Sequence, residues 1–394
     1  MRLMSTKARP WLWQLPDWPR FTFDVTRAAT ALTHAHERQG RIYGMAHAIG
    51  VSGLEDAVRE VWTQEALSTA AIEGETLDLQ VVRSSVLRRL GVDDGGPLQR
   101  HVEGLVDVLQ DATRGHDKPL NLDRLCGWQS ALFDGTAAHR RIAVGRLRDH
   151  AESMEIVSGP IGREVVHYIA PPSAKVPAGI KAFLKWFAAT TPRPGKPPDM
   201  DSIARAAIAH LWFETIHPFE DGNGRVGRAI ADMVLAQGDR SPVRLYSLSR
   251  QILAERSGYY DALAAAQHST MDATGFVIWF AGAFGRACET SAGVILNSVQ
   301  KSQFWTAHAN QHINERQRRL LQRLLADGDG GFLGGLNVDK YLKIVKVSKA
   351  TATRDLSKLV GQNMLHTSGQ GKALRYWANV PVWTHGRGQS DAVE

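Results

Sequence analysis

Cysteine is scarce in this chain of 394 residues, since only Cys126 and Cys288 occur, far apart in the sequence. Two distant cysteines exclude a disulfide framework and favour a reducing compartment. No apolar run reaches the roughly 18 residues that a membrane-spanning helix needs. Residues 1–18 contain three cations but no apolar stretch before Trp11, which excludes a secretory signal. We therefore expect a cytoplasmic protein without a membrane partner.

Net charge is also missing from most of the chain. Residues 301–394 contain seven Lys, seven Arg and seven Asp or Glu, and their net charge of +7 equals that of the whole chain. Residues 1–300 are therefore neutral overall, and only the C-terminal segment is expected to attract an acidic partner. A hydrophobic content of 43% and a charged content of 22% fit a soluble globular protein of two or three domains.

Residues 217–228 contain a base and a metal ligand close together. His217 is a side chain whose charge changes near neutral pH, which suits a general base. Asp221 offers the hard oxygen ligands that Mg²⁺ prefers. These two groups, four residues apart, point to chemistry on a phosphate.

The same stretch also predicts a phosphate-binding turn. Gly222, Asn223 and Gly224 can leave backbone N–H groups uncovered, and apolar spacing predicts a helix over Arg225–Gln237. A glycine-rich turn that opens into a helix N-terminus is an anion cradle. Arg225 and Arg228 are three residues apart, so both can face one phosphate chain.

A plain helix-turn-helix elbow with a buried His and surface arginines is the alternative interpretation. Seven chemically purposeful residues within twelve positions instead favour phosphoryl or nucleotidyl transfer. The stretch also resembles the signature of Fic-domain proteins, H-P-F-x-[D/E]-G-N-[G/K]-R-x-x-R, and matches it at every fixed position. The resemblance implies transfer of AMP from ATP to a hydroxyl side chain of a protein.

This hypothesis gives each residue of the stretch a role. His217 would deprotonate the target hydroxyl, and Asp221 would hold Mg²⁺ against the phosphates. The remaining residues would bind the phosphates: Asn223 and the backbone N–H groups of Gly222 and Gly224 as the cradle, Arg225 on the β-phosphate side, and Arg228 at the γ-phosphate.

A second motif lies upstream, at Thr69–Gly74. Residues 65–72 are predicted to be helical with Gly74 as the C-cap, which leaves Glu73 at the helix end where a carboxylate is disfavoured. The plain interpretation is a solvated surface Glu. The run also resembles the inhibitory motif of Fic proteins, [S/T]-x-x-x-E-[G/N], which implies that Glu73 pairs with Arg228 and switches the enzyme off.

A turn cluster at Val157–Gly162, flanked by apolar residues, predicts a β-hairpin over 154–170. By resemblance it is the flap that positions the target hydroxyl, and its edge could bind an extended target segment.

The basic stretch Arg140–Arg148 is interpreted as a solvated face, and the aromatic cluster of residues 11–23 as a packed anchor. Tyr259 and Tyr260, on a helix predicted over 252–267, are candidates for the adenine pocket, with core packing as the open alternative.

The C-terminal segment has the winged-helix pattern. Helices are predicted over 315–326, 336–344 and 348–359, followed by a hairpin over 364–377. Lys349, Arg354 and Lys358 lie on or beside the expected recognition helix and are candidate DNA contacts. A docking or dimerisation module, with a homodimer, is the alternative.

The expected fold is mainly α: a Fic-type helical core with a β-hairpin flap, an N-terminal helical segment and a C-terminal winged helix. The expected boundaries are 1–115, 116–298, 299–380, and a tail at 381–394. We predict a protein adenylyltransferase that uses ATP and Mg²⁺ on a protein target or on itself and is inhibited by Glu73. A DNA-binding regulator with a nucleotide-sensing Fic core is the second hypothesis.

Overall fold

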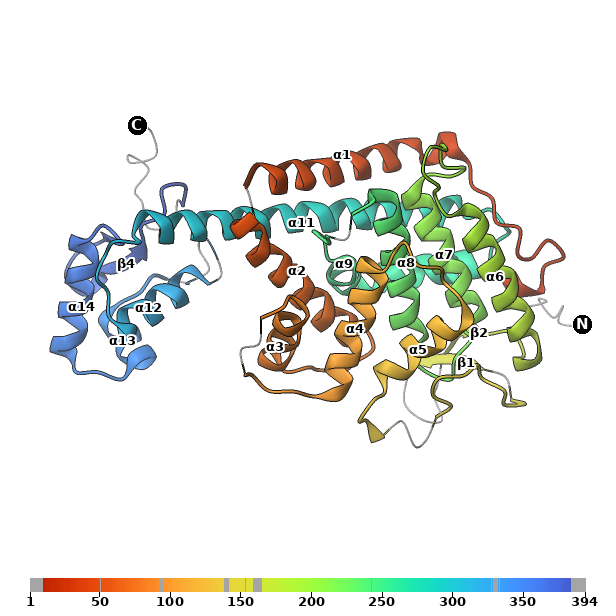
Figure 1. Cartoon of the computed structure of the whole chain (residues 1–394), viewed down its shortest axis with the longest axis horizontal. Helices are drawn as coiled ribbons and strands as arrows, with labels where there is room; N and C mark the ends of the chain where they lie inside the picture. The colour runs from red at the N-terminus through yellow and green to blue at the C-terminus, as the bar shows by residue number, and fades with distance from the viewer. Residues whose placement is uncertain are drawn as a thin grey trace, which may run out of the picture. The chain divides into compact units, whose positions relative to one another are not determined.

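The computed structural model describes residues 10–49, 51–92, 95–137, 142–152, 154–158, 165–241, 243–326, 328, 332 and 334–383. The described chain is mainly helical and contains two small hairpins, in agreement with the expected fold class (Figure 1). Contacts group it into two compact units, residues 1–44 with 58–291, and residues 45–57 with 292–394. The sequence predicts four segments, and this division into two units does not test their boundaries. Every described helix is too short or too polar to cross a bilayer.

Helices make up most of the first unit, and three of them, α1, α2 and α11, have residues in both units. In chain order the elements are η1 (Leu12–Gln14), α1 (Val25–Ile49), α2 (Val51–Ile72), α3 (Leu79–Arg89), α4 (Arg100–Arg114), α5 (Leu122–Leu132), β1 (Glu155–Ser158), β2 (Val165–Ile169), η3 (Ser173–Lys175), α6 (Val176–Thr190), α7 (Ser202–Ile216), α8 (Asn223–Asp239), α9 (Leu248–Ala254), α10 (Arg256–Gln267) and α11 (Thr274–Ala307).

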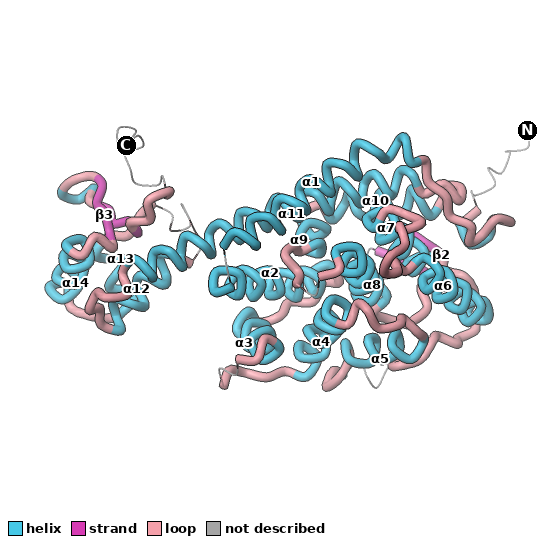
Figure 2. Tube along the Cα trace, turned by 45° about the horizontal axis from the view of Figure 1, so that its top comes forward, coloured by secondary structure: helices cyan, strands magenta, loops and turns pink. Residues whose placement is uncertain are grey.

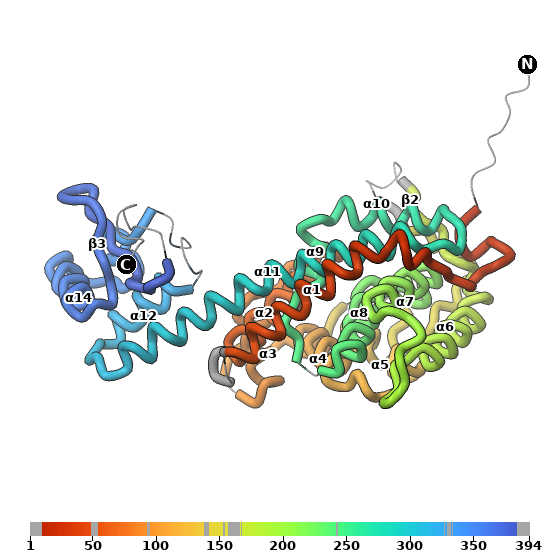
Figure 3. Tube along the Cα trace, turned by 90° about the horizontal axis from the view of Figure 1, so that it is seen from above, coloured from red at the N-terminus to blue at the C-terminus, as the bar shows by residue number. Residues whose placement is uncertain are grey.

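The antiparallel pair α7 and α8 forms the centre of the first unit, and the other helices surround it (Figures 1 and 3). Helix α7 starts where the Asp201 carboxylate accepts hydrogen bonds from the N–H groups of Ile203 and Ala204. Every residue from Ile203 to Ile216 is buried, including the polar side chains of Arg205, His210 and Glu214, so the helix is covered on all sides. The buried pair therefore gives a rigid base for the turn between the two helices.

The aromatic residues near the N-terminus pack as an anchor, as predicted. The rings of Trp18 and Phe21 lie 6.2 Å and 5.6 Å from that of Trp212 on α7. The Trp13 indole donates a hydrogen bond of 2.8 Å to the carbonyl of Ile169. These contacts fix the segment against both the central helix and the hairpin.

The helix predicted over 252–267 is wrong in its bounds, because two helices, α9 and α10, meet at Glu255. The backbone of Glu255 leaves the helical region (φ −114°, ψ 33°), and its carboxylate accepts two hydrogen bonds from Arg286 of α11. The side chain of Ser247 caps α9 earlier than predicted, by accepting from the N–H of Arg250. The hydrogen bonds between Glu255 and the distant helix α11 cannot be predicted from local periodicity.

Strands β1 and β2 pair in antiparallel register, with Glu155 opposite Ile169 and Ser158 opposite Val165. Figure 2 shows this hairpin beside α6 and α7. The predicted turn cluster falls largely on residues 159–164, which lie outside the described residues. The two strands themselves confirm the predicted hairpin.

The second unit contains, after the end of α11, the elements α12 (Glu315–Leu325), α13 (Val338–Val345), α14 (Lys349–Gly361), β3 (Leu365–Ser368), η4 (Gly371–Ala373) and β4 (Arg375–Ala378). Leu336 adds an antiparallel bridge to Tyr376 of β4. A core of leucines and aromatics from all three helices and the hairpin holds it together. The order of three helices and a hairpin agrees with the predicted pattern, and its designation as a winged helix stays a prediction.

Candidate active site

His217 ends α7 in a left-handed conformation (φ 49°, ψ 62°), and its N–H donates to the carbonyl of Phe213. The following Pro218 has no N–H and cannot continue the helix. Burial and the charge of Arg148 lower the pKa of His217 to about 4, against smaller opposing effects of Glu214 and Glu73. The ring is therefore neutral at physiological pH and can accept a proton.

The chain then turns into α8 at Gly222, which has a φ of 85°. Among the described residues no side chain caps this helix N-terminus. The amide of Asn223 bonds to Phe219 twice, accepting from its N–H (2.9 Å) and donating to its carbonyl (2.8 Å). Asn223 thus holds the turn in shape from inside, and its predicted direct contact with phosphate stays a prediction.

The carboxylate of Glu73 lies against the first turn of α8. Glu73 Oε1 lies 2.8 Å from Nη2 of Arg228, and a Cβ added at Gly224 would come within 2.3 Å of the same oxygen. The Arg228 guanidinium is buried and also donates to the side chain and carbonyl of Thr69 (2.8 Å and 3.0 Å). The end of α2 and the first turn of α8 are therefore joined by a buried arginine, at the place where a helix N-terminus binds anions.

The electrostatics of Glu73 are consistent with this position. Burial alone would raise the pKa of Glu73, but Arg228, Arg225 and His217 outweigh it, and the pKa is lowered. Glu73 is therefore ionised. It behaves as a bound anion and not as the solvated surface residue of the plain interpretation.

Arg225 and Asp221 differ in exposure, since the Arg225 side chain is buried and that of Asp221 is open to solvent. Nη1 of Arg225 is 3.3 Å from Glu75 Oε2, and its guanidinium stacks over the Phe133 ring at 5.0 Å. The Asp221 side chain is 57% exposed, and no described group of three or more acidic, His or Cys side chains surrounds it. A single exposed carboxylate suits Mg²⁺, which keeps several waters and takes its other ligands from phosphates. The donor set therefore fits the metal that the sequence implies.

Polar side chains are also buried behind His217. Oε2 of Glu214 lies 3.8 Å from Nδ1 of His217, and burial raises the pKa of Glu214 to about 8. His210 bonds through Nε2 to the hydroxyl of Tyr259 (2.9 Å), and burial lowers the pKa of His210 to about 4. Gly227 leaves room for the side chains of Glu214 and His210. A Cβ at this position would lie 2.3 Å from Glu214 Oε1 and 3.2 Å from His210 Nδ1. His210 is therefore a core residue, 1% exposed.

Comparisons with known proteins bear on this geometry. Residues 119–235 match the Fic/DOC family, and residues 11–92 match a domain of unknown function, DUF4172. The chain contains a Fic domain. Protein adenylyltransferase Fic of Nematostella vectensis is 26% identical to it over 217 residues, 55% of this chain and 45% of that protein. The protein of the same name from Drosophila mojavensis is 28% identical over 219 residues, 55% of this chain and 38% of the relative. The match thus spans less than half the length of either relative.

The fold of the Fic domain is also found in solved structures. A Fic family protein from Desulfovibrio desulfuricans G20 aligns with a TM-score of 0.54 at 22% identity, covering 94% of this chain and 99% of that one. The likeness at this identity concerns the fold. The resemblance stated from the sequence motif is confirmed at the level of the family and its fold.

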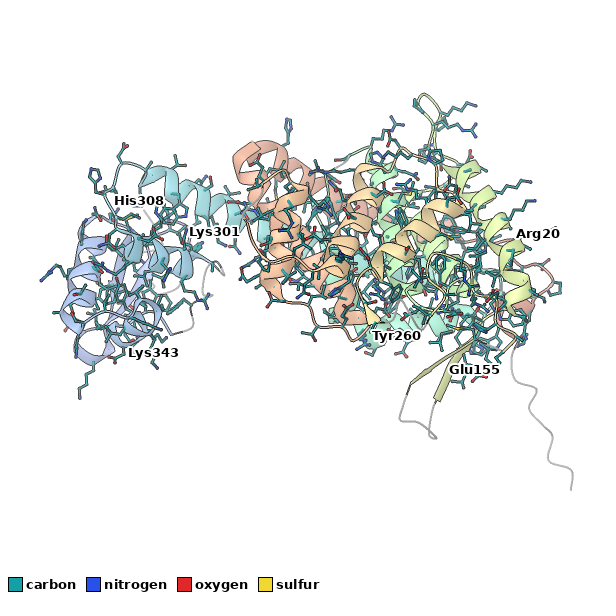
Figure 4. All side chains as sticks on the ribbon, turned by 60° about the horizontal axis from the view of Figure 1, so that its bottom comes forward. Arg20, Glu155, Tyr260, Lys301, His308 and Lys343 are labelled. Atoms are coloured by element: carbon teal, nitrogen blue, oxygen red, sulfur yellow. The ribbon has the colours of Figure 1, made fainter. Side chains whose placement is uncertain are left out.

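The two tyrosines near the Fic site differ in accessibility. Tyr259 is 2% exposed and bonded to His210, whereas Tyr260 is 42% exposed. Figure 4 shows Tyr260 with Glu155 of the hairpin on the same unit. Of the two predicted adenine contacts, Tyr260 is the one that a ligand can reach without repacking the core. Both assignments stay predictions.

Sequence reasoning missed Arg148. The predicted solvated face over Arg140–Arg148 is wrong at this residue, whose side chain is 1% exposed, while Arg146 is exposed as expected. Arg140 and Arg141 lie outside the described residues. The guanidinium of Arg148 is buried because it satisfies backbone carbonyls next to His217. Glu75, the partner of Arg225, was also missed, although it lies only two residues beyond Glu73.

The predicted DNA contacts belong to the second unit. Lys349, Arg354 and Lys358 of α14 are all exposed, and Nζ of Lys358 also donates to the carbonyl of His312 (2.7 Å). Figure 4 marks Lys343 on the neighbouring α13, which is exposed as well. These side chains are therefore available to an anionic partner.

Proposed function

We propose that this Fic domain transfers AMP from ATP to a hydroxyl side chain of a protein, which can be the chain itself. The observation that carries the proposal is a neutral, partly buried His217 next to a helix N-terminus whose anion position is held by a carboxylate. A base beside an anion site is the minimum needed for attack of a hydroxyl on a phosphate. The name of the relatives, protein adenylyltransferase, supports the same activity.

In the proposed reaction His217 takes the proton of the target hydroxyl. The hydroxyl oxygen forms a bond to the α-phosphorus of ATP, and the bond from that phosphorus to the bridging oxygen breaks, releasing pyrophosphate. The backbone N–H of Gly224 and the guanidinium of Arg225 stabilise charge on the phosphate oxygens. The N–H of Gly222, predicted for the same role, donates to Asp221 Oδ1 in this structure. Such catalysis is mainly positioning and electrostatic stabilisation.

Mg²⁺ would be held by Asp221. When bound, it would neutralise phosphate charge and favour departure of the pyrophosphate. One oxygen of Asp221 already serves the turn, since its Oδ1 accepts from the N–H of Gly222 (2.6 Å). Its second oxygen is the one we assign to the metal.

Glu73 keeps the proposed enzyme inactive in our view. Its carboxylate takes up the guanidinium of Arg228 and the space above Gly224, both of which the γ-phosphate requires. ATP would then bind only in a non-productive position. A partly buried, charge-assisted pair contributes on the order of 2 kcal/mol, enough to shift productive binding by roughly thirtyfold.

Incubation with ATP labelled at the α-phosphate, followed by mass spectrometry of the modified residues, tests the proposal. Glu73→Gly should raise label transfer, including self-modification, by roughly thirtyfold. Glu60→Gln, which removes a negative charge elsewhere on α2, is the matched control and should behave as wild type. Adding His217→Ala to Glu73→Gly should reduce transfer by at least about a hundredfold while ATP binding is retained. Transfer within about tenfold of the parent would refute the role of His217.

DNA binding by the second unit is a second candidate function. It is favoured by the exposed cations of α14 and by the location of the entire net charge in residues 301–394. Both functions can coexist in one chain, because they use different units. Docking to a protein, or to a second copy in a homodimer, is the alternative, and the salt dependence of duplex binding separates it from DNA binding.

A further inference from the structure

Four consecutive backbone carbonyls at the end of α7, Thr215 to Pro218, accept hydrogen bonds from two residues outside the helix. The hydroxyl of Tyr168 donates to Thr215 (2.5 Å). Arg148 donates to the other three, to Ile216 from Nη2 (3.3 Å), to His217 from Nε (2.7 Å) and to Pro218 from its backbone N–H (2.9 Å). A helix C-terminus leaves such carbonyls without intrahelical donors. Arg148 and Tyr168 supply the missing donors.

The same two residues also connect to the base of the β1–β2 hairpin. Tyr168 lies on β2, and Nη2 of Arg148 also donates to the carbonyl of Pro171, just after β2, at 2.5 Å. Nη1 of Arg148 donates to the hydroxyl of Ser173 at 3.0 Å. Both side chains are almost fully buried, at 1% and 3% exposure. One buried guanidinium therefore bonds to the backbone on both sides, at His217 and at the hairpin.

His217 needs such support. A non-glycine residue at a φ of 49° is in the left-handed region, which carries a cost and persists only where surrounding contacts hold it. The proline that follows removes the N–H of residue 218, so the chain here has few donors of its own. Hydrogen bonds to the carbonyls on both sides of the His217 Cα fix the direction in which the imidazole leaves the backbone.

We propose that Arg148, assisted by Tyr168, is a positioning residue that fixes the imidazole of His217 and ties it to the base of the hairpin. The proposal rests on the proposed AMP transfer for its effect on rate. It assigns Arg148 no contact with substrate. Movement of the hairpin base, for example when a target segment lies along β2, would be transmitted to His217 through one side chain.

The charge of Arg148 adds an electrostatic effect that can be measured without any reaction. Three titratable or charged groups act on His217: Arg148 from the segment before the hairpin, Glu214 from the preceding turn of α7, and Glu73 from the end of α2. Arg148 disfavours the protonated imidazole, whereas Glu73 and the backbone of Glu214 favour it. Removing the Arg148 charge should therefore raise the pKa of His217.

The test uses the full chain with Glu73→Gly as parent. The variants are Arg148→Gln, Arg148→Lys and Tyr168→Phe, with Arg146→Gln as matched control, since Arg146 is only two residues away, has the same charge, and is 58% exposed. Three quantities are measured for each: self-modification rate, ATP affinity by calorimetry, and the pKa of His217. The last comes from an NMR titration of labelled histidines, with the His217 signal identified by its loss in His217→Ala.

We expect Arg148→Gln to reduce transfer by roughly a hundredfold, the loss that a misplacement of about 1 Å can cause, with ATP affinity within about twofold of the parent. It should also raise the pKa of His217. Arg148→Lys keeps the charge and should leave that pKa unchanged, yet it should still lose transfer because one ammonium cannot replace the planar fork. Tyr168→Phe, which removes one donor, should lose roughly fivefold.

The proposal is overturned if Arg148→Gln matches Arg146→Gln in both transfer rate and the pKa of His217, or if transfer falls only in proportion to ATP affinity. If Arg148→Gln does not fold, the transfer rates of Arg148→Lys and Tyr168→Phe decide, and rates equal to that of the parent for both variants overturn the proposal. Absence of transfer from the parent itself, with ATP bound, would instead count against the proposed function. The His217 titration would then decide the present proposal alone.

Discussion

Arginine is used in opposite ways in the two units. In the first unit several guanidinium groups are almost fully buried and each bonds to backbone or carboxylate oxygens, namely those of Arg148, Arg205, Arg228 and Arg244. Between residues 292 and 383, the described part of the second unit buries no cation. The charged residue that it does bury is Asp355, bonded to Tyr341 and Gln317.

The difference shows that burial decides what a charge does. A buried guanidinium must be satisfied on all sides, so it fixes the geometry of whatever it touches. An exposed one is solvated and remains available to a partner, at little benefit to stability. The first unit thus contains the cations that hold a site in shape. The second unit contains residues 301–394, with their net charge of +7, and exposed cations that can attract a ligand.

The largest expected effect concerns Arg244, which bonds to Asp232 (2.5 Å) and Glu65 (3.2 Å) in the core. Arg244→Met leaves two buried carboxylates without their cation and should destabilise the first unit by about 3–5 kcal/mol. Arg319→Met, at an exposed position of α12, should change stability by less than about 0.5 kcal/mol. Urea unfolding followed by circular dichroism measures both. Equal urea midpoints for the two variants would show that buried and exposed arginines do not differ in their contribution to stability.

Arg228 should show the next largest effect, on activity. In a Glu73→Gly parent, Arg228→Ala should lower AMP transfer by roughly tenfold to a hundredfold, because a charged hydrogen bond to the nucleotide contributes about 1.5–3 kcal/mol. The measurement is the transfer rate at several ATP concentrations. Arg323→Ala on α12 is the control at an exposed arginine. An Arg228→Ala variant as active as its parent would show that this guanidinium serves only to bind Glu73.

For the second unit, replacing Lys349, Arg354 and Lys358 by alanine should weaken duplex DNA binding. The salt slope should also fall, by up to about 0.9 for each phosphate that is no longer neutralised by a side chain. Alanine at Lys181, Lys185 and Lys196, three exposed cations of the first unit, is the matched control. Fluorescence anisotropy gives both the DNA affinity and its salt slope. The measurements cover roughly 50 to 200 mM salt, the range over which such slopes are determined. A wild-type chain without salt-dependent binding would favour the docking alternative.

The smallest effect is expected at the half-exposed pair of His36 and Asp201, whose Nε2 and Oδ2 lie 2.6 Å apart. The hydrogen bond to Asp201 raises the pKa of His36 above its usual 6.5, against the effect of burial. The pair therefore stabilises the fold below about pH 6.5 and loses this contribution as the pH rises through the raised pKa. Solvent screening limits it to less than about 1 kcal/mol.

Thermal unfolding of His36→Gln and of wild type between pH 6 and pH 9 measures this contribution, in steps of about one pH unit to resolve a single titration. The two melting temperatures should converge toward the alkaline end. His34→Gln, at an exposed position two residues away, should follow wild type throughout. A gap that persists at alkaline pH would mean that packing, and not charge, accounts for the role of His36.

How much the sequence predicts depends on how local each feature is. The phosphate-binding turn lies within twelve consecutive residues, and the helix ends around it follow from Asp201, Pro218 and Gly222, so it could be predicted. Arg148 could not, because its neighbour Arg146 gives the same local signal. What buries Arg148 is a set of carbonyls about 70 positions further along the chain, at Ile216 to Pro218. The break at Glu255 has the same origin, a partner on a distant helix.

Asn223 illustrates a different limit. Its position in the turn was predicted. Its side chain, however, forms hydrogen bonds with the backbone of Phe219 and does not point to the phosphate position at the N-terminus of α8. Motif spacing gives the residue and leaves the direction of its amide open, because both directions satisfy the same donors and acceptors. The order of elements in the second unit was predicted from periodicity and caps. For its function the sequence left two alternatives open, DNA binding and docking, since exposed cations fit more than one partner.

Gly224 imposes a constraint on how this protein can evolve. Any side chain there would collide with the carboxylate of Glu73, at 2.3 Å from the first added carbon. The Fic signature accepts either Gly or Lys at this position, so the proposed nucleotide site itself tolerates a side chain there. The constraint on residue 224 therefore comes from the carboxylate of Glu73. A larger residue at position 224 is expected only in chains in which that carboxylate has moved or has been lost.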